Sequence, residues 1–450
     1  MAGTESTLRI LRRLLASGLT ARAERLLARL HPADLGPLLS ALTPEETRTV
    51  IDLLFRQHRA ADTLRELPPE LLPQIFEALG DERIAQVVAR LEVDDMLEFV
   101  ERLPEERREA IEALLPEDKR TELEKARLYP EQSAGRLMTT RFLALDEKMT
   151  AQEAIDTIRA SGDDQEAITY LYVVDEKRHL RGVVPLRRLV AAPPERTCAE
   201  LMIENPIHVR AAADQEEAAQ LVARYNLLAI PVTDDEGRLL GVITVDDVID
   251  VITEEATEDM YHLAGLHDED RVFSPPTAAM RQRLPWLLLN LGASFLVAYV
   301  IGIFERTLEQ SVALAFFMPM VSGMAGNGGI QSLTVITRGI ALGEIEFSSG
   351  LRAVAKEFGV AVGVGAVTGV VAGALAWLWQ GNPFLGVVLA AAMLVTMATA
   401  GILGAAVPLL LKTLGYDPAV GSGVVVTTLT DLFGFAFFLG IATFMLDRLA

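Results

Sequence analysis

Long stretches without charge follow Arg283, and they constrain the fold more than any other feature of the chain. They cover residues 284–304, 311–337, 358–411 and 418–446, with Asp431 as the single charge inside them. A helix needs about 20 apolar residues to cross a bilayer, and the 358–411 stretch, interrupted by the letters WQGNPF, is long enough for two. The sequence therefore predicts five membrane-spanning helices, at about 284–304, 311–337, 358–379, 384–411 and 418–446.

Charge divides the chain just as unevenly. Residues 281–450 hold eight basic and eight acidic side chains, so the whole net charge of −21 belongs to residues 1–280. Such an acidic surface repels phosphates, which excludes nucleic acid as a partner, and it suits either solvation or divalent cations. Cys198 is the only cysteine, which excludes a disulfide framework and indicates a reducing compartment. The first residues show no secretory-signal pattern.

The basic residues between the spans predict the orientation. Six lie in the segments that face the cytoplasm if residues 1–280 are inside, and two lie in the other segments. The positive-inside rule then places residues 1–280 in the cytoplasm of a multi-pass protein of the plasma membrane. With five spans, the C-terminus is expected outside.

Two spans carry residues that are unusual at membrane depth. The second contains Pro319 and a run of glycine and amide residues, from which we expect a broken helix beside protein or water: Gly323, Gly326, Asn327, Gly328, Gly329 and Gln331. In the fifth, Asp431 costs about 2.5–3.5 kcal/mol at mid-bilayer. It is either protonated and hydrogen-bonded within a bundle or part of a hydrated path beside Thr427, Thr428 and Thr430.

The second of these readings predicts a cation pore between the second and fifth spans. One carboxylate is too few to strip the waters of Mg²⁺, whereas two symmetry-related carboxylates hold the ion through its waters. Glycines spaced by four residues mark close helix contacts, within one subunit or at a dimer seam: Gly359, Gly363, Gly365, Gly369 and Gly373.

The cytoplasmic part begins with a helical array and continues with an internal repeat. Residues 1–130 are helix-periodic, and LTPEE, LPPEL, LPEER and LPEDK each place proline and acidic residues at a helix start. Segment 135–158 then aligns with 199–222. We expect an irregular helical solenoid followed by two similar α/β domains, at about 135–192 and 199–252.

The repeat resembles a tandem pair of cystathionine-β-synthase (CBS) domains, which commonly bind adenine nucleotides. The second copy keeps the pattern Gly-h-h-Thr-x-x-Asp as Gly241, Thr244 and Asp247. The first copy has Pro185 and Arg188 in place of the threonine and aspartate, although Arg187 and Arg188 suit phosphate. The resemblance implies ATP as a regulator, with a site that includes Tyr170, Arg187, Thr244 and Asp247.

An acidic segment, 253–274, connects the CBS pair to the spans at 275–450. Glu254 and Glu258, and likewise Glu255 and Asp259, lie four residues apart, so like charges stack on one helix face and destabilise it. Both a bound counter-ion and simple solvent exposure remain open readings.

In this order, the acidic helical domain (1–130), the CBS pair (131–252), the connecting helix and the five spans resemble the MgtE family of magnesium channels. The most specific motifs are Asn327-x-Gly329-x-Gln331-Ser332, YDPA at 416–419 and TDLFG at 430–434. The resemblance implies a homodimer whose pore lies between the subunits, with Asp431 on hydrated Mg²⁺ and with Gly323, Gly326, Asn327, Gly329, Gln331, Thr427 and Thr428 lining the path.

The resemblance further implies that cytosolic Mg²⁺ closes the channel through the connecting helix. The matching sensor positions are Asp62, Asp94, Asp214, Glu216, Asp247, Asp250, Glu255, Glu258, Asp259 and Asp417. Asn226 stands where the family can carry aspartate, which puts a site there in doubt. Selectivity among Mg²⁺, Mn²⁺, Co²⁺ and Ca²⁺ does not follow from the sequence.

Three other functions compete with this one. A coupled divalent-cation carrier or exporter would use Asp431 to carry a proton. A membrane-anchored nucleotide sensor leaves Asp431 and the second span unexplained. An enzyme is disfavoured, because the six histidines lack metal-ligand spacing and no nucleophile–base motif occurs.

Overall fold

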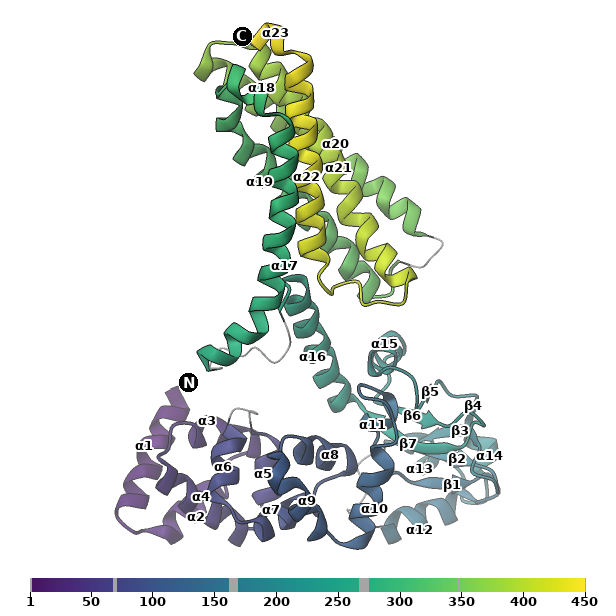
Figure 1. Cartoon of the computed structure of the whole chain (residues 1–450). Coiled ribbons are helices and arrows are strands. Elements are labelled where there is room, and N and C mark those ends of the chain that lie inside the picture. Colours follow the sequence, from purple (N-terminus) through teal and green to yellow (C-terminus); the bar gives the residue numbers. More distant parts are fainter. Residues whose placement is uncertain (1, 68–70, 162–168, 267–274, 346–348, 450) are drawn as a thin grey trace. The chain divides into compact units, whose positions relative to one another are not determined.

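The computed structural model describes residues 2–67, 71–161, 169–266, 275–345 and 349–449. The chain divides into two compact units, Met1–Val251 and Ile252–Ala450, which we describe separately (Figure 1).

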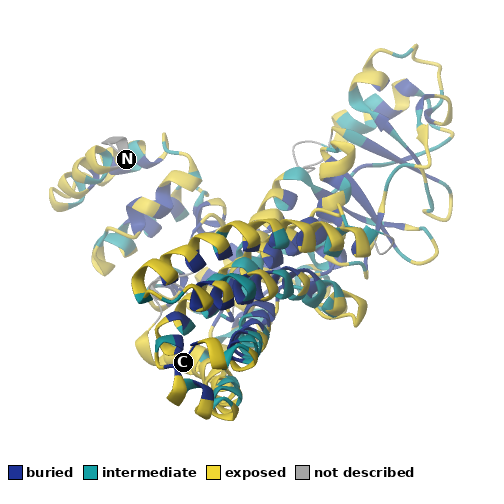
Figure 2. Ribbon diagram, turned by 90° about the horizontal axis from the view of Figure 1, so that it is seen from above, coloured by how far each residue is buried: buried dark blue, intermediate teal, exposed yellow. Residues whose placement is uncertain are grey.

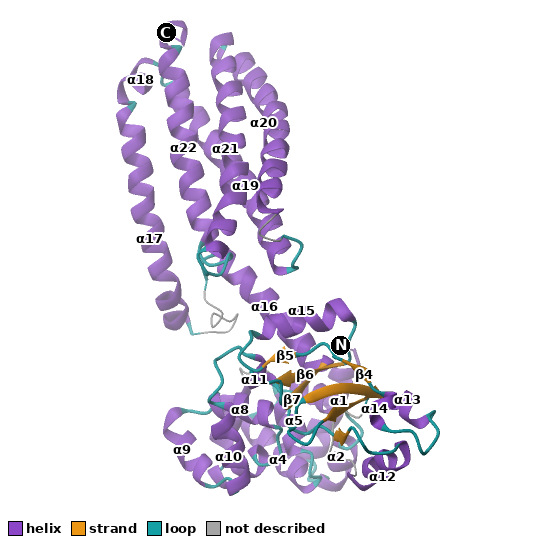
Figure 3. Ribbon diagram, turned by 90° about the vertical axis from the view of Figure 1, so that its right-hand side faces the viewer, coloured by secondary structure: helices purple, strands orange, loops and turns teal. Residues whose placement is uncertain are grey.

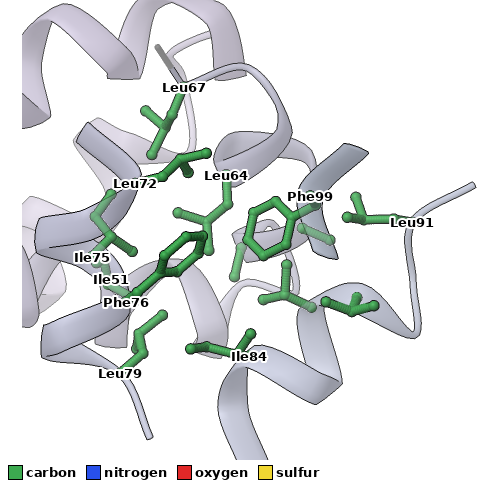
Figure 4. Close-up of a cluster of buried hydrophobic side chains, with 14 of the residues drawn as sticks. Ile51, Leu64, Leu67, Leu72, Ile75, Phe76, Leu79, Ile84, Leu91 and Phe99 are labelled. Carbon is green, nitrogen blue, oxygen red and sulfur yellow. The ribbon is translucent and has the colours of Figure 1, made fainter. Parts of the chain in front are cut away.

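The first unit opens with the expected array of short helices. They are α1 (Ala2–Ala16), α2 (Thr20–Leu27), the 3₁₀ turn η1 (Pro32–Asp34), α3 (Leu35–Leu39), α4 (Pro44–Arg56), α5 (Ala60–Arg65), α6 (Leu72–Ala78), α7 (Asp81–Val88), α8 (Val93–Glu101), α9 (Glu105–Ala113) and α10 (Glu117–Ala126). Their apolar faces share one core, in which the rings of Phe76 and Phe99 meet edge to face at 5.3 Å between centroids (Figure 4). Burial of such side chains stabilises the array by about 1.5–3 kcal/mol each.

The proline motifs mark helix starts, but the proline is the first helical residue in one motif and the residue before the helix in two others. Pro44 is the first residue of α4, behind a capping box in which Thr43 and Glu46 each bind the other's backbone N–H. Pro104 and Pro116 instead precede α9 and α10 as their N-caps. Three residues of the LPPEL motif, 68–70, lie outside the described residues.

The repeat forms two similar α/β halves (Figure 3). The first comprises α11 (Ala134–Leu137), β1 (Ala144–Asp146), α12 (Ala151–Ser161), β2 (Tyr170–Val174), β3 (Leu180–Pro185) and α13 (Leu186–Val190). The second comprises α14 (Cys198–Leu201), β4 (Ile203–Glu204), β5 (Val209–Arg210), α15 (Gln215–Tyr225), β6 (Ala229–Thr233), β7 (Leu239–Thr244) and α16 (Val245–Leu263).

The strand pairing repeats as the aligned sequences do. The sheets have the orders β1-β2-β3-β4 and β5-β6-β7, and each pairs its first two strands in parallel and the next two antiparallel. The pairing shifts register at Val173/Val174 and again at Val232/Thr233, the same place in both halves. Cys198, which begins α14, lies fully buried against the core of the first half rather than that of the second, and burial raises the pKa of its thiol to about 11.

The second unit contains five helices that are long and apolar enough to cross a membrane. They are α17 (Pro276–Ile303), α19 (Ala313–Ala341), α20 (Gly350–Gln380), α21 (Pro383–Thr413) and α22 (Ser422–Phe444), joined by the short α18 (Glu305–Gln310) and followed by α23 (Leu446–Leu449). Each begins or ends some residues away from its predicted bounds. Figure 2 shows exposed residues along these helices, and α17 has no buried residue at all.

The expected break in the second span is wrong. α19 runs without interruption through Pro319 and all of its glycines. Two of these glycines serve close packing, because a Cβ atom at Gly328 would meet Met397 of α21 and one at Gly329 would meet Val426 of α22. Neighbouring helices at this distance compensate for the low helix propensity of glycine.

The glycines of α20 divide into two groups. Cβ atoms at Gly365, Gly369 and Gly373 would meet α21, at Met397, Ala390 and the Gly386 carbonyl respectively, so these glycines pack within one chain. Cβ atoms at Gly359 and Gly363 would meet nothing within 4 Å in the described part of the chain.

We therefore expect Gly373→Ala to destabilise the membrane unit. The added methyl group overlaps the Gly386 carbonyl, and overpacking of this kind costs about 1–3 kcal/mol. Gly363→Ala in the same helix is the matched control, because it gains the same helix propensity without the overlap. Thermal unfolding of the detergent-solubilised protein should show a lower midpoint for the Gly373 variant alone. Equal midpoints for the two variants would contradict the close packing of α20 on α21.

Candidate functional site

Asp431 lies in the middle of α22 and is half-buried against α19. The hydroxyl of Ser322, in α19, donates a hydrogen bond of 2.5 Å to its Oδ1 atom. A carboxylate at this depth needs such a partner, because hydrocarbon offers none. The contact joins the two spans that carry the predicted pore residues.

Small and hydroxylated side chains surround this contact. A Cβ atom at Gly326 would come within 3.9 Å of Thr427, and one at Gly329 would meet Val426 and Thr430. The hydroxyls of Thr427 and Thr428 donate to the carbonyl oxygens of Gly423 and Val424, one turn back, at 2.7 and 2.8 Å. Their donor hydrogens are thus used within α22, and the oxygen lone pairs are available to a water molecule or a hydrated ion.

The other predicted pore residues form a stripe along α19. Gly323, Asn327 and Gln331 follow one another at intervals of four residues, which places them on one face of the helix, and all three are exposed in the single chain. An amide side chain at membrane depth is poorly solvated by lipid. We refer to these three residues as the amide stripe.

A second site lies in the first unit, where α8 meets the start of α16. Burial, and then the nearby charges of Asp95, Asp247 and Glu92, raise the pKa of Asp94 well above its ordinary value. The Oδ1 atom of Asp94 is buried and has no hydrogen-bond partner among the described residues. A buried oxygen without a donor is costly, and a cation removes that cost.

The pKa values of neighbouring carboxylates are raised as well. Burial raises the pKa of Asp95 to about 6, although the guanidinium of Arg65 opposes the shift. Burial also raises the pKa of Asp247, against hydrogen bonds from Thr244 and with repulsion from Asp246. The pKa of Asp250 is raised by burial, then by Glu66 and Asp246. We call this group, Glu66, Asp94, Asp95, Asp246, Asp247 and Asp250, the cytosolic acidic cluster.

Arg65 neutralises part of this cluster. Its guanidinium lies 3.1 Å from Asp95 and 3.2 Å from Glu66. Glu92, beneath the cluster, is buried and accepts hydrogen bonds from Thr139 (2.6 Å) and Arg141 (3.1 Å), which ties the helical array to the CBS pair. The repulsion is therefore concentrated on the aspartates at the start of α16 and on Asp94.

Asp247, the third residue of α16, also caps the start of that helix. Its Oδ2 atom accepts hydrogen bonds from the hydroxyl of Thr244 (2.6 Å) and from the Thr244 backbone N–H (3.3 Å). The Thr-x-x-Asp pattern thus has a structural role as a helix cap, beside any role in binding.

A third group lies in the second unit, at the end of α16. The imidazole Nδ1 of His262 is 2.9 Å from Asp417 and 3.7 Å from Glu258. Burial, and then Asp417, raise the pKa of Asp259. The His262 carbonyl accepts a hydrogen bond from the Gly421 N–H (3.4 Å), and Gly265 packs beside Trp286 and Val424. This end of the connecting helix therefore contacts both α17 and the start of α22. The predicted remainder of the connector, 267–274, lies outside the described residues.

The remaining sensor candidates lie elsewhere. Asp62 is exposed on α5, and Glu255 lies along α16. Asp214 is the N-cap of α15, where its carboxylate accepts the Glu216 N–H at 2.8 Å. These four positions remain predictions as cation ligands.

Asn226 has a backbone reason for its identity. It ends α15 with a φ of 51°, in the left-handed region that asparagine tolerates better than most residues. Asn226, which stands where the resembling family can carry aspartate, is thus suited to a helix C-cap.

The nucleotide candidates lie in both halves of the repeat. Tyr170 begins β2 and Arg187 is exposed on α13, whereas Thr244 ends β7. The neighbouring Tyr172 is 1% exposed and its hydroxyl has no partner among the described residues. Both tyrosines contribute to the apolar cluster shared by the two halves.

Several residues escape sequence reasoning. Ser322, Arg65 and His262 each act on a partner that is distant in the sequence, such as the 155 positions between His262 and Asp417. The pairs Asp94-Asp95 and Asp246-Asp247 did carry a signal, since adjacent aspartates at a helix start attract a cation. Among the described residues, no three acidic, histidine or cysteine side chains are placed to hold a metal ion.

Comparison with protein families matches most of the chain between residues 30 and 441. Residues 318–441 match the MgtE model described as a divalent cation transporter, 30–132 match the MgtE intracellular N domain, and 134–195 and 198–254 match CBS domains. The magnesium transporter MgtE of Thermus thermophilus is 35% identical over 97% of this chain and 98% of its own length. The magnesium transporter MgtE of Bacillus subtilis is 34% identical over 92% of this chain and 95% of its own length.

Two solved structures resemble the cytosolic part. The soluble part of a magnesium transporter is 28% identical, with a TM-score of 0.53, and covers 56% of this chain and 99% of its own. The cytosolic domain of the Mg²⁺ channel MgtE in complex with ATP is 37% identical, with a TM-score of 0.51. The match covers 54% of this chain and 98% of that structure. Coverage and identity of this extent, along all domains in the same order, show that the chain belongs to the MgtE family of divalent cation transporters.

Proposed function

We propose that this protein carries Mg²⁺ across the membrane along a path formed by α19 and α22. The hydrogen bond from Ser322 to Asp431 carries this proposal, because it places a carboxylate and its polar support in the middle of two apolar spans. The full-length relatives bear the name magnesium transporter. Asp431 attracts the ion, and the threonine hydroxyls of α22 accept hydrogen bonds from its waters.

The working form is a homodimer with the path between its subunits. One Asp431 cannot replace the water shell of Mg²⁺, whereas two on opposite sides of an axis hold the hydrated ion without dehydrating it. The amide stripe supports this arrangement, because Asn327 and Gln331 are exposed in one chain and need polar surroundings at membrane depth.

The transporter is a channel for uptake. Basic residues between the spans favour a cytoplasmic first unit and an external C-terminus, in the plasma membrane. The negative interior then drives a dication inward, with about 2.3 kcal/mol per charge at 100 mV. A coupled carrier or exporter remains the alternative, and it differs in that transport would depend on an opposing proton gradient.

Internal Mg²⁺ closes this channel through the cytosolic acidic cluster. Burial, with repulsion from neighbouring acids, raises the pKa values of Asp94, Asp95 and Asp247, so a bound cation would stabilise their ionised forms. A dication bridging α8 and α16 favours the arrangement that brings them together. The ion shifts the equilibrium only by its greater affinity for that arrangement.

The end of α16 is the part that closes the path. Glu255, Glu258 and Asp259 lie along it, and Asp417 faces it from the loop between α21 and α22. Bridging these carboxylates with Mg²⁺ holds the helix against α17 and α22. The His262–Asp417 contact already links α16 to the loop before α22.

ATP acts as a regulator at the CBS pair. The 37% identical cytosolic domain was solved in complex with ATP. Thr244 and Asp247 preserve the family pattern, Tyr170 offers a ring, and the cations of Arg187 and Arg188 are exposed on α13. Asp247 then belongs to both the nucleotide site and the cytosolic acidic cluster, which couples the two ligands.

Replacement of Asp431 should stop Mg²⁺ uptake. Asp431→Ala and Asp431→Asn both remove the charge that attracts the ion. Each loss of about 1.4 kcal/mol in binding free energy lowers the affinity for Mg²⁺ tenfold. Uptake into proteoliposomes, followed with an encapsulated Mg²⁺ indicator, should fall at least about tenfold. Asp447→Asn, exposed on α23, is the matched control. Normal uptake by a well-folded Asp431→Ala protein would rule out the proposed path.

Neutralisation of the sensor carboxylates should abolish closing by internal Mg²⁺. We consider Asp247, Asp250, Glu255, Glu258 and Asp259 changed together to their amides. The amides are solvated by water but bind no bridging dication, so the channel should stay open as internal Mg²⁺ rises. Single-channel recordings across internal Mg²⁺ concentrations measure this response. Amides at the surface acids Glu105, Glu106, Glu109, Glu117 and Asp118 provide a control of equal charge change. An unaltered closing curve for the sensor variant would leave these carboxylates as ordinary surface charges.

ATP should bind mainly through the second CBS half. Thr244→Val removes the hydroxyl next to Asp247 and should weaken ATP binding to the full-length protein several-fold, as measured by calorimetry at fixed Mg²⁺. Arg188→Asp in the first half should have a smaller effect. Thr150→Val, at the start of α12, is a control for hydroxyl loss outside the site. A larger loss of affinity with Arg188→Asp than with Thr244→Val would reverse the ranking of the two halves.

A further inference from the structure

Glu357 is a buried carboxylate that the ion path does not use. It lies in the second turn of α20 and is 4% exposed. Its Oε2 atom accepts a 2.8 Å hydrogen bond from the hydroxyl of Ser332 in α19, and its Oε1 atom accepts one of 2.5 Å from Lys356. Ser332 is also buried, at 5%. A buried charge in a span is costly and marks a functional position.

The Ser332–Glu357 contact lies where three spans approach closely. A Cβ atom at Gly401 of α21 would meet the carbonyl oxygen of Glu357, and one at Gly404 would meet Ser332 and the Gly329 carbonyl. The glycines of α21 therefore leave room for α19 and α20 at this level. A hydroxyl enclosed in this way has little access to water, and its partner within the protein matters accordingly.

α19 is thus held by two serine–carboxylate hydrogen bonds to two different helices. Ser322 binds Asp431 of α22, and Ser332, ten residues later, binds Glu357 of α20. In helix geometry the two serines are about 15 Å apart along the axis and about 80° apart around it. Two anchors at different heights and in different directions determine both the rotation and the axial position of α19.

We propose that Glu357 is a positioning residue for ion transport: as hydrogen-bond acceptor for Ser332, it fixes the rotation of α19 that aligns Ser322 with Asp431 and directs the amide stripe. The proposal rests on the proposed function, since alignment matters only if ions pass Asp431. Glu357 itself does not touch the ion, because it is enclosed by its own subunit.

The surroundings show that the acceptor matters more than the charge. Lys356 has a 61% exposed side chain, so its ammonium group stays solvated when the carboxylate is neutralised. Ser332 has no such alternative, because it is buried. Glu357→Gln keeps an oxygen for Ser332 and should preserve the alignment. Glu357→Met keeps the length of the side chain without an acceptor and should lose it. Ser332→Ala removes the donor with a minimal change in volume.

The experiment compares these variants as full-length protein in proteoliposomes. Uptake is measured over a range of external Mg²⁺, so that half-saturating concentration and maximal rate are separated. We expect Glu357→Met and Ser332→Ala to raise the half-saturating concentration about fivefold, the scale of one buried hydrogen bond. The double variant should be no worse than either single one, and Glu357→Gln should recover to within about twofold. Val360→Met, exposed on the same helix, is the control.

A second measurement does not depend on which ion is transported. Hydrogen–deuterium exchange of the α19 segment 322–331 should be faster in Glu357→Met and Ser332→Ala than in wild type, Glu357→Gln or Val360→Met. If wild-type vesicles take up no Mg²⁺, the proposed function fails, and this comparison still decides whether Glu357 positions α19.

Three results would overturn the proposal. The first is unchanged half-saturation and α19 exchange in both Glu357→Met and Ser332→Ala. The second is equal damage from Glu357→Gln and Glu357→Met, which would make the charge the active feature. The third is additive effects in the double variant, which would show that Ser332 and Glu357 act independently. Thermal unfolding of each sample separates all three from a simple loss of folded protein.

Discussion

A carboxylate placed in hydrocarbon is the constraint on which the membrane unit depends. Asp431 requires a donor, and the donor comes from a neighbouring helix, so α19 and α22 must approach closely enough for Ser322 to reach it. Close approach in turn requires small residues, which explains why α19 carries glycine at 329, where a Cβ atom would overlap Val426 of α22. The polar and the glycine-rich features of these spans therefore have one cause. Each is costly alone, and together they form a close contact between two spans.

Repulsion between carboxylates has the opposite role in the first unit. The cytosolic acidic cluster gathers aspartates that burial and mutual proximity make reluctant to ionise. Their ionised forms are therefore unfavourable in this arrangement, and a nearby positive charge favours them. Arg65 and Glu92 limit this cost, because one supplies a fixed positive charge and the other is fully hydrogen-bonded. The result is a surface on which negative charge is only partly compensated.

The features that were predictable from sequence are those that depend on composition and on short spacings. The absence of charge predicts all five spans, and self-similarity predicts the two CBS halves, because both signals are local. The continuity of α19 was missed, since glycine propensity is local whereas the packing that offsets it comes from α21 and α22. The Ser322–Asp431, Ser332–Glu357 and His262–Asp417 contacts were also missed, because nothing in the spacing of distant residues indicates which side chains will meet. Asn226 shows the reverse case, in which a residue treated as a departure from the family has a conformational reason.

The burial of Cys198 has a chemical consequence. A thiol with a pKa of about 11 is almost entirely protonated at neutral pH, and a fully buried sulfur atom is beyond the reach of alkylating reagents. While it is folded, the natural chain therefore does not react with maleimides or methanethiosulfonates. A cysteine introduced at Asn327 or Gln331 would be its only reactive thiol. Labelling from one side of the bilayer, and then from the other, would report from which side water reaches the amide stripe.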